Sequence, residues 1–433
     1  MSDFLTPQQL EEKWSPILDH ADLPKIADTH RRFTTAVLLE NQEKAIREEK
    51  QTLMEAGLPS SNVGGAAGYD PVLIGLVRRS MPQLIAYDIC GVQPMTMPTG
   101  LVFSLKSRYT SMSGTEALFN EADAGFSGAT GQTQAGNSPV ESTNGASPWD
   151  ASAGFTRGAA MTSASVAEQI NPQSMSFSIE KFSVTAKSRA LKADYSVELA
   201  QDLKAVHGLD AEGELSNILS NEILAEINRE VVRNIYYTAK PGAQLATTAG
   251  TFDLDVDANG RWSVERFKGL LFQIEREANL IGQQTRRGRG NFLLCSADVA
   301  SALAMTGQLD YTPALAANAN MNIDDTSTTF AGTLNGKYKV YIDPYMGNGT
   351  TDQFCMVGYR GKSPFDAGMF YCPYVPLSLM RAVDPDTFQP KIGFKTRYAL
   401  ASHPFAGANT ATTGTISASD NTYFRLFKIA NLA

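Results

Sequence analysis

Four groups of residues in this 433-residue sequence could support chemistry: a glycine-lysine stretch, four histidines, four cysteines and a short arginine cluster. The first runs Gly332-Thr-Leu-Asn-Gly336-Lys337-Tyr338. A phosphate-binding P-loop needs GxxxxGK followed by Ser or Thr, because the loop wraps the phosphates and the hydroxyl reaches magnesium. Here the spacing is one residue short, and Tyr338 replaces the small hydroxyl. We therefore predict a β-turn that leads into the next strand.

The histidines and cysteines form no catalytic or metal-binding pattern that we can identify. No two histidines are paired at helical spacing, and His207 precedes Gly208 at an expected helix end, a common capping position. The cysteines lack CxxC and zinc-ligand spacing, and Cys295 and Cys355 lie in apolar, strand-like runs typical of inert core thiols. We predict no catalytic residue, no cofactor, no metal and no enzymatic activity. The other residues considered are His20, His30, His403, Cys90 and Cys372.

The arginine cluster, Arg286-Arg287-Gly288-Arg289, has two possible interpretations. It could contact phosphate, or it could form salt bridges to an acidic neighbouring subunit. The formal net charge is −8, and proteins that grip phosphate backbones are usually basic. We favour the protein–protein interpretation and expect a candidate intersubunit basic loop.

Composition narrows the class of protein further. Hydrophobic residues make up 43% of the chain, which is enough for a sizeable core, and charged residues only 19%. The length allows about two or three domains. No apolar run approaches the ~18 residues of a membrane helix, and the acidic start MSDFLTPQQLEEKW lacks the order of a signal peptide. Four cysteines suit a reducing compartment, so we expect synthesis in the cytosol.

The elements that must position these residues begin with a charged N-terminal segment. Residues 1–55 contain 11 acidic and 7 basic residues, a net charge of −4. A helix is predicted from Thr29 to Glu55, with Leu39, Ile46 and Leu53 seven residues apart. This narrow apolar stripe suits either a partner helix or docking on the chain's own core. The glycine-rich residues 57–71 indicate a flexible linker, and hence a separable segment.

Two strands are expected further along the chain. Residues 101–109 alternate apolar and polar side chains, which predicts a half-buried strand. Residues 176–187 alternate as well, with a change of phase at Glu180–Lys181 that suggests a β-bulge. The weakly hydrophobic stretch between them is either disordered or an arm that orders against another surface. Scattered large apolar residues in it, such as Leu118, Phe126 and Trp149, favour an arm that packs on a partner.

The remaining sequence predicts a mixed α+β fold. Apolar residues at four-residue steps predict a long helix over 211–238, which Pro241-Gly242 ends. The rest alternates helices and strands without a regular βαβ series, so a doubly wound enzyme fold is not expected. Apolar residues 85–92 suit a packed segment that leads into the 101–109 strand.

Several long motifs resemble the major capsid protein of T-even-like tailed phages. They include GLVRRSMPQLIAYDICGVQPMTMPTGLVFSLKSRY, KSRALKADYSVELAQDLKAVHGLDAEGEL, FKGLLFQIEREA, FAGTLNGKYKVYID and FDAGMFYCPYVPL. The resemblance runs with gaps from about residue 70 to the C-terminus. It implies the Hong Kong 97-type capsid fold, with an N-terminal arm, an extended loop, a spine helix in a peripheral domain, and an axial domain.

The resemblance also implies how the chain is divided. The extended loop is shorter here than in the T-even archetype, so an insertion domain in it would be reduced. The implied divisions are a cleavable, scaffold-interacting propeptide (1–55), an N-terminal arm and junction (56–100), the extended loop (101–187), the peripheral domain with its spine helix (188–242), the axial domain (243–380) and a return to the peripheral domain (381–433).

A processing site follows from the same resemblance. The family is made as a precursor whose N-terminal segment is removed by a prohead protease that prefers Leu or Ile, any residue, then Glu. Leu53-Met54-Glu55 before Ala56 fits this preference, beside the boundary that charge and linker composition indicate. We expect cleavage after Glu55.

The implied function is self-assembly into hexameric capsomers of an icosahedral or prolate phage head that encloses double-stranded DNA. The implied partners are other copies of the chain, the scaffolding core, the prohead protease, vertex and portal proteins, and decoration proteins. Packaged DNA would be met only non-specifically, and no membrane is expected. The expected location is the virion capsid, after assembly in the host cytoplasm. The alternatives are the pentamer-forming vertex paralogue and an encapsulin-like compartment shell.

Overall fold

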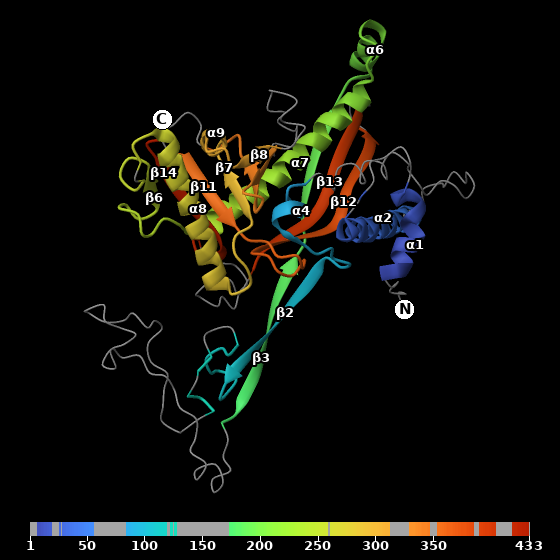
Figure 1. Cartoon of the computed structure of the whole chain (residues 1–433). Coiled ribbons are helices and arrows are strands. Elements are labelled where there is room, and N and C mark those ends of the chain that lie inside the picture. Colours follow the sequence, from blue (N-terminus) through green and yellow to red (C-terminus); the bar gives the residue numbers. More distant parts are fainter. Residues whose placement is uncertain are drawn as a thin grey trace, which may run out of the picture. The chain divides into compact units, whose positions relative to one another are not determined.

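The computed structural model describes most of the chain as helices, strands and ordered loops (Figure 1). Both element types occur in quantity, which confirms the α+β class. Contacts divide the chain into two units, Met1–Gly100 with Ser183–Ala433 and Leu101–Phe182, which we describe separately. The described residues are 7–19, 26, 28–55, 84–118, 122–123, 125–127, 173–258, 260–311, 329–346, 353–384, 389–403 and 418–432.

A four-stranded sheet forms one part of the larger unit. Its order is β1-β12-β13-β4, and the edge strand β1 runs parallel to β12. The pairing of β12 with β13 shifts register between Pro373 and Val375 and again before Ser378. The prolines of β12 explain these shifts, because a proline has no N–H for the ladder. The strands are β1 (Gly91–Val92), β12 (Met369–Val383), β13 (Pro390–Ser402) and β4 (Lys187–Asp194).

An eight-stranded sheet forms the other part of this unit. Helices α8 (Ser263–Thr285) and α9 (Ala297–Met305) pack on its central strands. Parallel and antiparallel pairs are mixed, as expected for a fold without regular βαβ units. The order is β5 (Ala239–Pro241), β14 (Asn421–Ala430), β11 (Gln353–Gly358), β7 (Phe292–Cys295), β10 (Tyr338–Ile342), β9 (Thr329–Leu334) and β8 (Leu309–Tyr311), with β6 (Thr251–Asp253) also on β14.

The long helix α7 (Ala211–Thr238) has the predicted bounds and packs against strands of both sheets, β4, β13 and β14 (Figure 1). Most of the predicted apolar stripe is buried, including Leu219, Ile227 and Ile235, but Ile218, at the position expected to widen it, is 60% exposed. Before it, α6 (Val197–Val206) ends at His207, followed by Gly208 with φ +68°. The predicted helix end at these two residues is confirmed.

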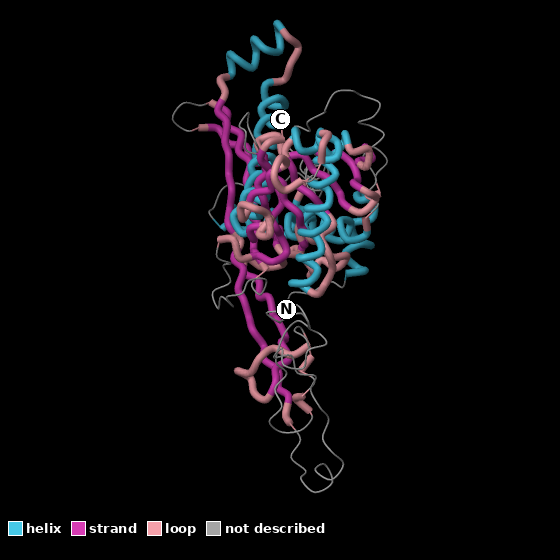
Figure 2. The backbone as a smooth tube through the Cα atoms, turned by 60° about the vertical axis from the view of Figure 1, so that its left-hand side comes forward, coloured by secondary structure: helices cyan, strands magenta, loops and turns pink. Residues whose placement is uncertain are grey.

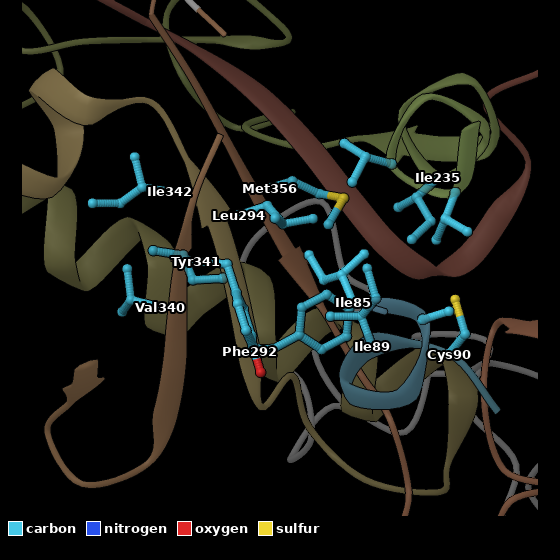
Figure 3. Close-up of a cluster of buried hydrophobic side chains, with 14 of the residues drawn as sticks. Ile85, Ile89, Cys90, Ile235, Phe292, Leu294, Val340, Tyr341, Ile342 and Met356 are labelled. Carbon is cyan, nitrogen blue, oxygen red and sulfur yellow. The ribbon is translucent and has the colours of Figure 1, made fainter. Parts of the chain in front are cut away.

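The segment that joins the N-terminal part of the chain to the first long strand is packed in the core. It contains the short helix α4 (Ala86–Ile89) and then β1. Figure 3 shows Ile85 and Ile89 near Leu294 and Met356 of the eight-stranded sheet, and Cys90 belongs to the same buried cluster. The prediction of a packed segment at residues 85–92 is confirmed.

The smaller unit is built on a two-stranded ribbon of β2 (Thr99–Tyr109) and β3 (Met175–Thr185) (Figure 2). The expectation that its apolar side is buried was wrong. Leu105 is 70% exposed and Ile179 63%, whereas Lys106 is only 6% exposed. A two-stranded ribbon has no second layer of its own, and no described residue of this unit covers the apolar side chains of Leu105 and Ile179.

The predicted β-bulge in β3 is also not supported by the described side chains. Exposure keeps one alternating phase from Met175 to Thr185, with odd-numbered positions outward; Glu180 is the one position whose side chain is not described. Phe177 and Ile179 point outward, whereas Val184 is buried. The apolar residues change face along an alternating strand, which in the sequence looks like a slip of register.

The N-terminal segment forms two helices, α1 (Pro7–Leu18) and α2 (Thr29–Glu55), and the predicted bounds of α2 are confirmed. Helix α2 packs against α1 and against β12. Its middle is buried around the helix rather than along one stripe, since residues 36–39 are all at most 5% exposed. Of the two interpretations of this helix, the structure therefore shows docking on the chain's own core.

Candidate functional site

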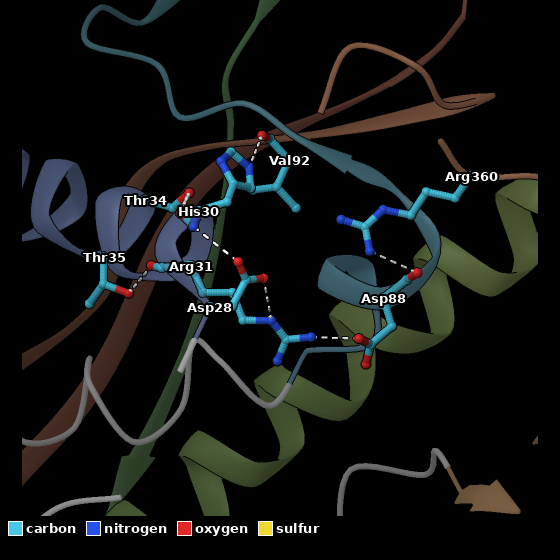
Figure 4. Close-up of polar contacts among 8 residues, drawn as sticks. All are labelled: Asp28, His30, Arg31, Thr34, Thr35, Asp88, Val92 and Arg360. Carbon is cyan, nitrogen blue, oxygen red and sulfur yellow. Dashed lines mark hydrogen bonds and ion pairs between the residues drawn. The ribbon is translucent and has the colours of Figure 1, made fainter. Parts of the chain in front are cut away.

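The N-terminal helices are attached to the body of the protein by polar contacts as well as by apolar packing (Figure 4). His30 lies at the start of α2, and its Nε2 donates to the carbonyl of Val92, 2.9 Å away. Val92 belongs to β1, and no described strand pairs with the outer edge of β1. The imidazole therefore satisfies an acceptor on the open edge of the four-stranded sheet.

Arg31 ties the same helix to α4. Its guanidinium lies 2.5 Å from the Asp88 carboxylate and 5.6 Å from the Tyr87 ring centroid. Arg360 holds the other side of this turn by donating to the Asp88 carbonyl at 3.0 Å (Figure 4). The Arg31–Asp88 ion pair is about one-third exposed, so it orients the helix more than it stabilises it.

Asn41 makes the most buried of these contacts. Its side-chain amide donates to the carbonyl of Met95 at 2.8 Å and to that of Tyr374 at 2.9 Å. Tyr374 lies where the register of β12 shifts, between Pro373 and Val375. The amide satisfies two acceptors at an irregular point of the sheet, and Asn41 itself is only 5% exposed.

Helix α1 is held on α2 by a mixed apolar and charged contact. Trp14 is 2% exposed, and Lys13 Nζ lies 2.7 Å from Glu40 and 2.6 Å from Glu43. Burial would raise the pKa of the Glu40 carboxyl, but the hydrogen bond and charge of Lys13, with the Trp14 indole, lower it below its usual value. Arg32 adds a two-pronged contact to Asp19 at 2.7 and 2.8 Å.

The predicted processing residues lie at the end of α2. The backbones of Leu53 and Glu55 belong to its last turn. Their side chains, and the whole of Ala56, lie outside the described residues.

The predicted basic loop follows α8. Arg286 caps that helix in the left-handed region with φ 55°, so the chain turns sharply there. Arg287 lies 3.9 Å from Asp366, and Arg289 lies 3.6 Å from Glu275. The arginines thus do not converge on one site, and two of them face acids of their own chain at distances too long for a hydrogen bond.

The other candidates from the sequence fall into structural roles. The Gly332–Gly336 stretch runs from the end of β9 into the turn of the β9–β10 hairpin, where Asn335 and Gly336 have positive φ, so the predicted β-turn is confirmed. All four cysteines are free and buried. Burial raises the pKa of Cys295 to about 12 and that of Cys355 well above its usual value, which agrees with inert core thiols.

Sequence reasoning missed a buried ion pair in the larger unit. Arg425 and Glu277 lie 3.2 Å apart with side chains 4% and 1% exposed. Glu277 also accepts from the backbone N–H of Ala243 and from Gln273. The partners lie 148 residues apart, so no local spacing could have revealed them.

Among the described residues, no three His, Cys, Asp or Glu side chains gather as a metal site would require. None of the described helices is both long and apolar enough to cross a bilayer. The features described above are surface contacts and anchors of the N-terminal helices.

Comparison with known proteins gives one consistent result. The sequence model of the Gp23 family, described as major capsid protein Gp23, matches residues 66–429. The major capsid protein of Vibrio phage KVP40 is 40% identical, over 96% of this chain and 98% of that protein. The capsid vertex protein of Enterobacteria phage T4 is 30% identical, over 54% of each chain.

Among solved structures, the capsid protein of Myoviridae Phage XM1 covers 80% of this chain and 91% of its own, at 10% identity and a TM-score of 0.40. That likeness is too weak to support an inference. The family match and the identity to the KVP40 protein span most of the chain, and they are sufficient to assign the family. The chain belongs to the Gp23 family of major capsid proteins, which build the shell of tailed phages.

Proposed function

We propose that this chain is the hexamer-forming subunit of the shell rather than the vertex subunit, and that its role is purely structural. The comparison with two kinds of relative supports the first part. The match to a major capsid protein extends over 96% of the chain, whereas the match to a vertex protein extends over 54%. Imaging of particles that carry a labelled copy would place the label on the hexamers; a label confined to the fivefold vertices would refute the proposal.

The exposed side of the β2–β3 ribbon supports a contact between copies. Leu101, Leu105, Phe177 and Ile179 on this ribbon are 59 to 70% exposed. Soluble proteins rarely leave a contiguous apolar patch uncovered, so such a patch marks an interaction site. In a shell, the partner would be a neighbouring copy of the chain. The ribbon of each subunit would pack on the next subunit, and symmetry would repeat this contact.

We further propose that the chain is a precursor from which residues 1–55 are removed after Glu55. The pattern of Leu or Ile, any residue, then Glu occurs five times, ending at Glu12, Glu40, Glu48, Glu55 and Glu226. The first three and the last lie within helices that continue past them. Of the five, only Glu55 lies in the last turn of its helix, and it comes just before the glycine-rich residues 57–71, a composition at which proteases prefer to cut.

The observation that carries the processing proposal is therefore that α2 ends at Glu55. Mass spectrometry of mature particles should find Ala56 as the first residue, and an intact residue 1 or 2 would overturn it. Glu55→Gln should block processing, whereas the matched Glu49→Gln, which lies outside the Leu/Ile-x-Glu pattern, should not.

Charge gives the removal of this segment a physical consequence. The segment carries −4 of the chain's −8, so the processed subunit would carry −4. The retained negative charge would limit sticking of packaged DNA. Before removal, the acidic helices would face the scaffolding core, and portal, vertex and decoration proteins would be further partners of the shell.

The basic loop remains a candidate contact between subunits. The side chains of Arg287 and Arg289 stay 56% and 42% exposed, and their contacts within the chain are long. Exposed pairs of this kind contribute little, so the arginines can exchange these acids for those of a neighbour. Replacing Arg286, Arg287 and Arg289 together by Gln should raise the subunit concentration needed for assembly; unchanged assembly would refute the contact.

A further inference from the structure

We propose that the surface under α1 and α2 is a helix-binding site that keeps the N-terminal segment docked after the chain has been cut. Cutting and release would then be separate steps. This inference deepens the proposed processing after Glu55 and rests on it. It concerns what the cut segment does next, which cleavage by itself leaves open.

The polar contacts of this site pair hydrogen-bond donors on the helix with acceptors on the body. In these described contacts the body offers acceptors: the carbonyls of Val92, Met95 and Tyr374 and the carboxylate of Asp88. Helix α2 brings the donors to them, from an imidazole, a guanidinium and a carboxamide. They come from His30, Arg31 and Asn41.

The apolar part belongs to the main core. Residues 36–39 of α2 are at most 5% exposed, and Trp14 and Leu18 of α1 are each 2% exposed. All of them except Val37 belong to one buried cluster with Leu84 and Val92 of the body. Departure of the helices would open this cluster to water, which is unfavourable because exposed apolar area costs free energy in proportion to its extent.

None of these contacts depends on the bond after Glu55. The last described anchor, Asn41, lies fourteen residues before the cut. Cutting therefore removes the tether but leaves the donors, acceptors and buried side chains in place. The described contacts also show what must change for release: the body has to close the core and find new donors for three carbonyls beside β1 and the irregular part of β12.

The test uses the full chain with a recognition sequence for a site-specific protease placed within residues 57–71 and an affinity tag at the N-terminus. After cutting, we expect the body to co-purify with the tagged fragment through affinity capture and size exclusion. Prompt separation of the fragment from a body that keeps its circular dichroism spectrum would overturn the proposal.

Matched variants test the site itself. Asn41→Ala removes the donor from the carbonyls of Met95 and Tyr374 and should speed release of the cut fragment about tenfold or more. Glu12→Ala, at an exposed position of α1, should leave the rate unchanged. Equal release rates for the two variants would count against the assigned contacts. The retention experiment uses the wild-type sequence of the helices. Its result therefore stands even if one of the variants fails to fold.

This experiment is independent of the natural processing site, because the engineered cut does not use Leu53-Met54-Glu55. Mature particles that begin at residue 1 would refute the proposed processing and leave the helix-binding site standing. Prompt separation after the engineered cut would refute the site and leave the processing standing.

Discussion

The N-terminal helices and the β2–β3 ribbon differ in the burial of their apolar side chains. In α1 and α2 the side chains of Trp14, Leu18 and Leu38 are buried, and the amide of Asn41 beside them meets acceptors of the body. In the ribbon, Leu105 and Ile179 face solvent while Lys106 is buried.

The difference shows where each segment finds its partner. Burial of apolar surface is the main favourable term in folding. A segment that buries its apolar side chains against its own chain therefore needs no partner subunit. A segment that leaves apolar residues exposed buries them only when the surface of another molecule covers them. We therefore expect mutations in the ribbon to affect assembly, and mutations in the helices to affect the subunit.

The largest effect is expected in the ribbon. Ile179→Asp places a charge on the exposed apolar side and should reduce the yield of assembled shells more than tenfold, because every subunit repeats the defect. The melting temperature of the unassembled subunit should change little, since the position is exposed. Ser183→Asp, an outward position of the same strand, is the matched control for added charge. Equal yields from the two variants would break the comparison.

In the helices, the largest effect should come from Trp14→Ala. Removal of a fully buried indole costs about 3–5 kcal/mol, and we expect α1 and α2 to open locally by that amount. Hydrogen exchange of amides 31–45 should accelerate at least a hundredfold. Assembly should suffer less than with Ile179→Asp; a reversed order would contradict the division between the two regions.

Asn41→Ala should have an intermediate effect. It leaves the carbonyls of Met95 and Tyr374 without their donor, which costs about 1–3 kcal/mol. The same hydrogen-exchange measurement reports it. Lys44→Ala, at an exposed position of the same helix, should stay within about 0.5 kcal/mol. If the two behave alike, the contact of Asn41 with the body does not stabilise the helix.

The smallest effect concerns pH. Burial acts to raise the pKa of Glu40, but Lys13 and Trp14 outweigh it and hold it below the usual 4.5. A lowered pKa in the folded state means stability that is present above pH 4.5 and is lost as the pH falls through the folded value. Protection of amides 31–45 should therefore weaken in acid. Glu40→Gln should remove this dependence, and an unchanged pH profile in that variant would exclude the Lys13–Glu40 pair as its source.

The sequence predicted the elements well where the pattern is local. The bounds of α2 and α7, the helix end at His207 and the hairpin turn at Asn335-Gly336 all follow from propensity, periodicity and turn chemistry. It misjudged the ribbon because alternation shows which side chains share a face and not which face is covered. The anchors of α2 were equally hidden, since Asn41 and Tyr374 lie 333 residues apart.

The sequence by itself determined the α+β class, the principal helices and strands, and the membership of a family of shell proteins, because long motifs and local periodicity carry this information. Only the tertiary structure decided that the N-terminal helices dock on their own body, that two of the loop arginines face acids of their own chain, and that the ribbon exposes its apolar side. These outcomes depend on contacts between distant segments. The free energy of each contact depends on which residue packs against a given side chain, and local spacing in the sequence does not show this.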